Sequence, residues 1–311
     1  MKTAVVALGG NAISGSGKED IHRQFANTRK SLDSIIALVR ADYNLAVTHG
    51  NGPQVGNALL RVERTMEDIP AQPLGVIVAD TEGSMGYMIE QSLQNRLIRE
   101  KIDRPVATIV TQVIVDRDDP SIKNPSKFIG PFYTKEQAEL LACKFGWTTK
   151  EDVGRGFRRV VPSPSPKAIL NKEIIRRLVS ERTIVIAGGG GGIPVYIEHD
   201  GTYEGVDAVI DKDLASAVLA RDIGAEILLI LTSVGKVALN FKKPNQLDLD
   251  LLKVEDAKRY LKEGHFPAGS MGPKIEASVN FIEAGGKAVI ITSLERAQEA
   301  IAGQAGTRIV K

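Results

Sequence analysis

The sequence predicts an α/β fold in which one large, mainly parallel sheet is covered by helices on both faces. Short apolar runs of strand length alternate with segments of helical spacing through most of the 311 residues. The strand runs are almost continuously apolar, which is typical of parallel strands buried on both sides. Several runs end in glycine-rich turns, at the position where parallel α/β sheets bind ligands.

The first half of the chain carries a clear alternation. Strands are predicted over 5–8, ending at Gly9-Gly10, and over 45–47, ending at His49. The run 106–115 predicts one more buried strand. Apolar residues three or four positions apart predict two helices, marked by Leu32, Ile35, Ile36 and Val39 and by Ile89, Leu93 and Leu97.

Residues 116–166 differ in composition from the rest of the chain and predict an insertion that protrudes as a subdomain. Prolines and charged residues cluster around a helical pattern over 135–145. A flexible linker is the weaker interpretation, because aromatic side chains within the stretch need burial. These side chains are Phe128, Phe132, Tyr133, Trp147 and Phe157.

The alternation resumes after the insertion. Five consecutive glycines follow one strand, and Asp200-Gly201 is a sequence typical of a hairpin turn. The predicted elements are strands over 183–187, 227–231 and 288–292 and helices that begin near Asp211 and at Gly272-Pro273.

Composition argues against several classes of protein. The 40 basic and 38 acidic residues are spread evenly and give a net charge of +2, so there is no basic stripe of the kind that binds nucleic acid. The apolar runs are too short to cross a membrane, and we expect no leader peptide before the first strand. The single cysteine, Cys143, excludes an internal disulfide and is expected to be buried or half-buried. We therefore expect a cytoplasmic protein.

Four glycine-rich loops lie at 9–11, 50–52, 188–192 and 269–272. Glycine lets the backbone approach a ligand closely, so that N–H groups converge on an anion, and four such loops predict a polyphosphate or small-anion site. The motifs of P-loop, dinucleotide-binding, zinc-protease and serine-hydrolase sites are absent from the sequence, and no metal ligand set is predicted. His49 is expected to position other groups and not to catalyse.

Two lysines stand in the first turns of predicted helices. Lys212 follows Asp211, which can cap its helix, and Lys274 follows Pro273. The helix dipole disfavours a cation at this position, so a bound phosphate would explain both lysines. Asp213 is expected to hold the lysine heads in place, although an acid in the first turn of a helix is also favourable by itself.

The chain also resembles the carbamate kinases, through motifs that occur in the family order and cover essentially its whole length. The first one, LGGNA, indicates only the wider amino acid kinase superfamily, whereas the GPFY and GSMGPK motifs are more specific. The motifs are LGGNA (8–12), THGNGPQVG (48–56), NPSKFIGPFY (124–133), GRGFRRVVPSPSP (154–166), AVIDKDLA (208–215) and HFPAGSMGPK (265–274).

This resemblance implies a three-layer αβα sandwich with two lobes that bind different substrates. An N-terminal lobe, 1–180, would bind carbamate and include the lid at 116–166, and a C-terminal lobe, 181–311, would bind the nucleotide. Lys127 of the lid would join Lys212, Asp213 and Lys274 around the transferred phosphoryl group. Contacts with phosphate and carbamate would come from Gly9, Gly10, Asn11, Gly50, Asn51, Gly52, Gly189, Gly190 and Gly191. Contacts with the nucleotide would come from Asp211, Thr232, Ser233, Val237, Ala238, Met271 and Gly272.

The implied reaction is reversible phosphoryl transfer between ATP and carbamate, with Mg²⁺, in a homodimer that makes ATP during fermentative arginine or agmatine breakdown. Ala238 and Ser233 stand where many relatives have tyrosine and aspartate. Three alternatives remain: a kinase of a larger carboxylate such as acetylglutamate, a non-catalytic nucleotide-binding regulatory protein on the same fold, and a nicotinamide-dependent dehydrogenase.

Overall fold

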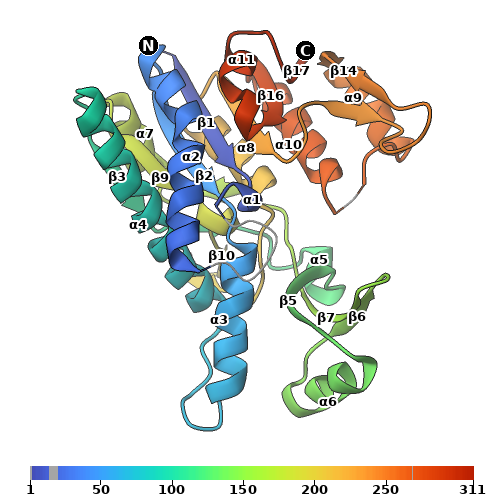
Figure 1. Ribbon diagram of the computed structural model, residues 1–311. Helices are drawn as coiled ribbons and strands as arrows, with labels where there is room; N and C mark the ends of the chain where they lie inside the picture. The colour runs from blue at the N-terminus through green and yellow to red at the C-terminus, as the bar shows by residue number, and fades with distance from the viewer. Residues whose placement is uncertain (1, 14–19, 268) are drawn as a thin grey trace.

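A sheet of eight strands runs through the centre of the molecule in the computed structural model, which describes residues 2–13, 20–267 and 269–311 (Figure 1). The strands are parallel, except that β17 runs antiparallel to β16 and β15 follows β17. The order across the sheet is β15 (Leu251–Lys253), β17 (Thr307–Val310), β16 (Ala288–Ser293), β12 (Ile227–Thr232), β1 (Thr3–Leu8), β2 (Asn44–His49), β9 (Ile184–Ala187) and β3 (Val106–Ile109). The predicted large, mainly parallel sheet is therefore confirmed.

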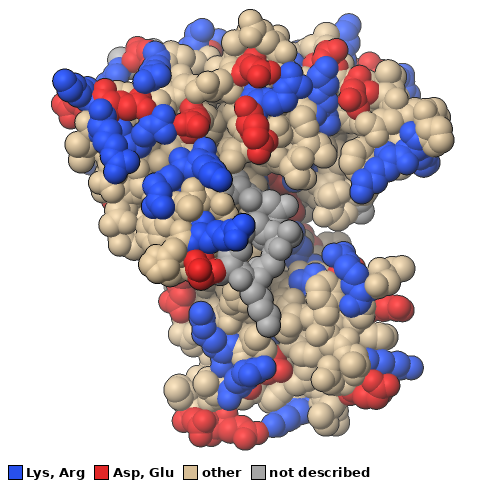
Figure 2. Space-filling view, in the orientation of Figure 1, with Lys and Arg blue, Asp and Glu red and all other residues tan. Residues whose placement is uncertain are grey.

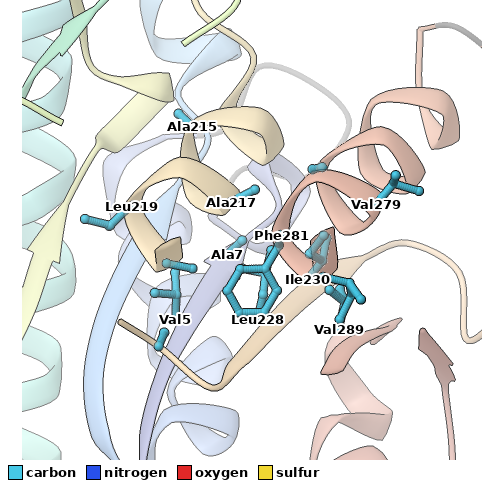
Figure 3. Packing of buried hydrophobic residues seen from close by; sticks show 14 of the residues in the cluster. Val5, Ala7, Ala215, Ala217, Leu219, Leu228, Ile230, Val279, Phe281 and Val289 are labelled. Atoms are coloured by element: carbon cyan, nitrogen blue, oxygen red, sulfur yellow. The ribbon is translucent and has the colours of Figure 1, made fainter. Parts of the chain in front are cut away.

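Helices cover both faces of this sheet, because alternate residues of each strand face opposite sides. On β1, Val5 and Ala7 pack into one core cluster, whereas Ala4, Val6 and Leu8 pack into the other. The first cluster is covered by α7 (Lys172–Ser180), α8 (Lys212–Asp222), α9 (Val254–Lys262) and α10 (Met271–Glu283). The second is covered by α2 (Ile21–Arg40), α4 (Leu74–Glu100) and α11 (Ala297–Ile301). Figure 3 shows α8 and α10 packed over β1 and β12 through residues such as Val5, Leu219 and Phe281.

The predicted insertion forms a lid with its own sheet and helices (Figure 1). Its helix α6 (Lys135–Phe145) has the predicted bounds, because a Thr134–Gln137 capping box begins it and the left-handed Gly146 ends it. The other lid elements are β5 (Lys127–Tyr133), β6 (Thr149–Asp152), β7 (Gly156–Val161) and α5 (Pro120–Lys123). Figure 2 shows an open gap between the lid and the C-terminal part of the main body, with acidic and basic residues interspersed over this face.

Smaller elements connect the lid to the main body. Asp200-Gly201 lies in the predicted hairpin, between β10 and β11, whose strands pair antiparallel. Around it is a four-stranded sheet of β11 (Tyr203–Gly205), β10 (Ile193–Ile197), β4 (Gln112–Ile114) and β8 (Ala168–Ile169). The remaining elements are α1 (Gly10–Ile13), α3 (Gly52–Thr65), β13 (Val237–Leu239), β14 (Leu247–Leu249) and the 3₁₀ turns η1 (Gly189–Gly191) and η2 (Leu294–Arg296). Within the described residues, no helix is both long enough and apolar enough to span a membrane.

Three local expectations are wrong. The run 106–115 is not one buried strand but splits into β3, which is half-buried at the sheet edge, and β4, which belongs to another sheet. Cys143 is exposed, because α6 buries only Ala138. Phe132 is 47% exposed, with the Arg158 guanidinium 4.9 Å from its ring centre. The other lid aromatics are half-buried.

Candidate active site

The loops after β1 and β2 meet at the carboxyl edge of the sheet. These two strands pair in register up to their last residues, Leu8 and His49, so the glycines that follow are brought side by side. A Cβ on Gly50 would lie 3.0 Å from the backbone nitrogen of Gly10, and one on Gly9 would lie 2.8 Å from a backbone oxygen of β12. The predicted glycine loops therefore pack backbone against backbone, with no room for side chains at these positions.

The five-glycine loop joins this group because β9 lies between β2 and β3. Gly190 has a φ of +66°, and a Cβ there would lie 2.0 Å from the Asn51 amide nitrogen. A Cβ on Gly191 would lie 2.6 Å from the carbonyl oxygen of Ile210, directly before α8. Three loops far apart in sequence thus form one surface. Asn11 is the second residue of α1, and its side chain lies outside the described part of the structure.

A compact cluster of charges lies where α8 and α10 begin. Asp211 caps α8 by accepting from the backbone N–H of Asp213, and Asp213 then places its carboxylate between two lysines. The Lys212 and Lys274 ammonium nitrogens each lie 2.8 Å from a different oxygen of this carboxylate. The three side chains are largely buried, with 11%, 6% and 16% exposed for Lys212, Asp213 and Lys274. The predicted association of these residues is present in the structure.

The Lys212–Asp213–Lys274 cluster carries a net positive charge. Two ammonium groups share one carboxylate, and although burial raises the pKa of Asp213, the two lysines outweigh it and hold that pKa well below its usual range. The contact between Lys212 and Asp213 is an ion pair without hydrogen-bond geometry, so the buried Lys212 ammonium has donors to spare. A buried cation with unused donors is a place where an anion binds favourably.

Lys127 reaches this region from the lid. Its ammonium donates to the second carboxylate oxygen of Asp211 at 2.8 Å, and Asp211 uses its first oxygen to cap α8. The lid strand β5 is therefore tied to the helix that carries Lys212. This lysine is more exposed than the other two, with 35% of its side chain accessible.

Two cavities meet at Lys274. One, of about 450 Å³, is lined by Gly9, Gly10, Gly269 and the end of β12. The other, of about 290 Å³, has apolar walls at Phe241, Phe266 and Met271 and is called the apolar cavity below. Thr232, Ser233 and Ser270 line both of them. A polar cavity that continues into an apolar one has the form required by a phosphate chain followed by a base.

The predicted nucleotide contacts divide into three groups. Thr232, Ser233, Ala238 and Met271 line the apolar cavity. Val237 and Gly272 are buried beneath it, and Asp211 faces Lys127 instead. Sequence reasoning missed six residues that also line this cavity, although two of them belong to the HFPAGSMGPK motif. They are Val234, Lys236, Phe241, Lys242, Phe266 and Pro267.

Sequence reasoning also missed the support beneath the glycine loops. Glu82 of α4 is 1% exposed and accepts the backbone N–H groups of Gly189 and Thr111. Burial raises the pKa of Glu82 to about 8, against the opposing effect of these donors. His49 is fully buried beside Gly189, and desolvation lowers its pKa to about 4, so it is neutral at pH 7. A buried neutral ring agrees with the expected positioning role.

Known proteins resemble this chain over its whole length. The amino acid kinase family profile matches residues 2–293. The chain belongs to the amino acid kinase family. Carbamate kinases from Thermococcus kodakarensis and Pyrococcus horikoshii are 50% and 49% identical to this kinase, covering 100% and 98% of both chains. The structure of a carbamate kinase from Giardia lamblia bound to AMP-PNP has a TM-score of 0.92 and 42% identity, covering 100% of this chain and 98% of that one.

A more distant likeness indicates the fold alone. An N-acetylglutamate synthase from Neisseria gonorrhoeae shares 14% identity with this kinase at a TM-score of 0.57, and the match covers 61% of that chain. The much higher identity to carbamate kinases places the chain in that branch of the family.

Proposed function

We propose that this kinase transfers a phosphoryl group reversibly between ATP and carbamate. The observation that carries the proposal is the buried Lys212–Asp213–Lys274 cluster, which lies beside a nucleotide-sized pair of cavities. The full-length similarity to carbamate kinases supplies the acceptor. The apolar cavity takes the base, the cavity beside Gly9 and Gly10 takes the phosphates, and the loops around Asn51 and Gly190 take carbamate.

The reaction needs positioning and charge neutralisation more than acid–base chemistry. Carbamate is already an anion, so one of its oxygens attacks the γ-phosphorus without a base. The new O–P bond forms as the bond between this phosphorus and the β–γ bridging oxygen breaks, and the electron pair leaves with ADP. Negative charges must therefore be brought in line and compensated, and this is the task that lysines perform in phosphoryl transfer.

Each lysine receives a distinct task in this proposal. Lys274 lies at the junction of the two cavities and contacts the phosphoryl group while it is transferred. Lys212 contacts it from the acceptor side. Asp213 fixes both ammonium groups without neutralising both. Lys127 exchanges its bond to Asp211 for one to the phosphate when the substrates are bound, which closes the lid.

Mg²⁺ is proposed to enter with the nucleotide. Within the ranges 2–13, 20–267 and 269–311, no three Asp, Glu, His or Cys side chains are grouped to hold a metal ion. We propose that Mg²⁺ keeps several waters and is held mainly by the substrate phosphates. When bound, the ion neutralises phosphate charge, and the lysines supply the remainder.

We further propose a homodimer and a cytoplasmic location. A groove of about 670 Å³ lies between α2, α3 and α4, and apolar side chains around it are exposed, including Ile21 at 52%, Ile69 at 61% and Tyr87 at 56%. A second copy of the chain could cover this surface. The exposed thiol of Cys143 suits a reducing compartment.

The decisive experiment supplies carbamoyl phosphate, ADP and Mg²⁺ and measures ATP by luciferase. We expect ATP formation to depend on all three, and to be far slower when acetyl phosphate or N-acetylglutamyl phosphate replaces carbamoyl phosphate. A preference for an acylglutamyl substrate would favour the larger-carboxylate alternative. Tight nucleotide binding without any turnover would favour the regulatory one.

A further inference from the structure

Helix α4 contributes two neighbouring side chains from its N-terminal half to the back of the glycine loops. Thr81 accepts a hydrogen bond from the Asn51 amide nitrogen at 3.0 Å, and its own hydroxyl donates to the carbonyl of Val78 at 2.9 Å. Asn51 is 3% exposed and directly precedes α3. The loop that follows β2 is therefore held from behind by α4.

The next residue of α4, Glu82, holds the five-glycine loop that follows β9. One oxygen of Glu82 accepts from the backbone N–H of Gly189 at 2.8 Å, and the second accepts from the N–H of Thr111 at 3.0 Å. The Thr111 hydroxyl in turn accepts from the N–H of Gly188 at 2.9 Å. A single buried carboxyl group thus fixes the start of the five-glycine turn, both directly and through Thr111.

The space around this turn allows little movement. A Cβ on Gly189 would lie 2.4 Å from the His49 ring nitrogen and 2.9 Å from the Cγ of Glu82, and one on Gly190 would overlap the Asn51 amide. The two loops therefore touch each other and share one support. Neither loop can shift without disturbing Asn51, His49 or Glu82.

We propose that Thr81 and Glu82 are positioning residues that set the geometry, and so the affinity, of the acceptor subsite for a small planar carboxylate-type anion. The proposal rests on the assignment of carbamate to these loops. Helix α4 joins the loops of β2 and β9 into one rigid surface, whereas the cavities assigned to the nucleotide lie at β12 and α10. A defect in this support should therefore weaken acceptor binding and leave nucleotide binding almost unchanged.

The test uses Glu82→Gln, with Thr81→Val as a second, milder variant. Glutamine keeps the shape of the side chain, but its amide nitrogen cannot accept, so either the Gly189 or the Thr111 bond is lost. Glu90→Gln is the matched control, because Glu90 lies on the same helix and accepts from the Thr108 hydroxyl at 2.6 Å, away from the loops. For Glu82→Gln we expect the KM for carbamoyl phosphate to rise at least about tenfold, as loss of a buried hydrogen bond implies. The KM for ADP should stay within about twofold, and the control should change neither.

Amide hydrogen exchange measured without substrate provides an independent readout. In Glu82→Gln the amides of Gly188, Gly189 and Thr111 should exchange at least about tenfold faster, whereas those of β1 should keep their protection. Equal increases in both KM values, or unchanged exchange at these three amides, would overturn the proposal. If the wild-type protein makes no ATP, the carbamate assignment fails, and the exchange data then decide whether Glu82 holds the loop.

Discussion

Replacing Asp213 by asparagine tests the central feature of the site. Asparagine has nearly the same shape but removes the single negative charge between the Lys212 and Lys274 ammonium groups. Both lysines would then be left largely buried with no carboxylate beside them. The variant therefore separates the charge of residue 213 from its volume.

The expected cost follows from the geometry. At 2.8 Å, each lysine–carboxylate contact corresponds to an attraction of about 6 kcal/mol at an effective dielectric near 20. Desolvation of the charges offsets much of this, and removal of one partner from a buried ion pair costs about 3–5 kcal/mol. In a chain of this size that loss lowers Tm by on the order of 10 °C. Turnover should fall at least about a hundredfold, because the lysines lose their fixed positions.

Thermal unfolding at pH 7, with and without sulfate, is the appropriate measurement. Sulfate should stabilise Asp213→Asn more than the wild type, since the anion restores charge balance between the two ammonium groups. Asp222→Asn is the control, because Asp222 is also buried and paired with Arg221 but lies at the opposite end of α8. A Tm within about 2 °C of the wild type, or equal effects of sulfate on both Asn variants, would show that Asp213 does not balance the charge of the two lysines.

Other perturbations probe the individual groups. Lys212→Ala and Lys274→Ala should each lower turnover at least about a hundredfold while circular dichroism shows an intact fold, and near-normal turnover of either folded variant would refute its role. Lys127→Ala should have a smaller effect, because this lysine is more exposed and is proposed to act by closing the lid; steady-state kinetics would show an equal loss if it were an equal partner. His49→Asn should reduce the pH dependence of the free energy of unfolding in acid. The pKa of the ring is about 4 in the folded state and 6.5 in the unfolded state, so the unfolded state binds the proton more readily. The wild type should therefore lose about 3 kcal/mol of stability as pH falls from 6.5 to 4. Urea titrations between pH 4 and 7 would measure that slope, and equal slopes in both proteins would contradict the assignment.

The parts of the site that sequence predicted are those encoded by local patterns. Asp211 before Lys212 is a helix-capping sequence, and the structure shows the cap, so the position of Lys212 in the first turn followed from neighbouring residues alone. The glycine loops were found for the same reason, since each one directly follows a strand or precedes a helix. Alternation of strands and helices also determined the layers of the fold.

The parts that sequence missed depend on contacts between distant residues. Glu82 lies 107 positions from Gly189, inside a helix where glutamate is usually a surface residue, so no local pattern marks it. The run 106–115 is mostly apolar, and Thr111-Gln112 is only a weak local signal of the break after Ile109. That break exists because the Thr111 N–H turns towards Glu82 on another element. Residues 127 and 211 likewise meet only because the first residue of β5 lies beside the N-cap of α8.

Helix α3 links the lid to the loop that follows β2. It begins directly after Asn51, in the proposed acceptor loop, and extends about 21 Å along its axis. Along its length it contacts the lid, where Gly56 packs against Gly130 of β5 and Glu63 accepts from the Tyr133 hydroxyl at 2.7 Å. Because β5 also begins with Lys127, which donates to Asp211 at the start of α8, the lid is held by both α3 and α8. We therefore expect a displacement of the lid to reach both reacting sides of the proposed site, which would couple closure of the lid to phosphoryl transfer protected from water.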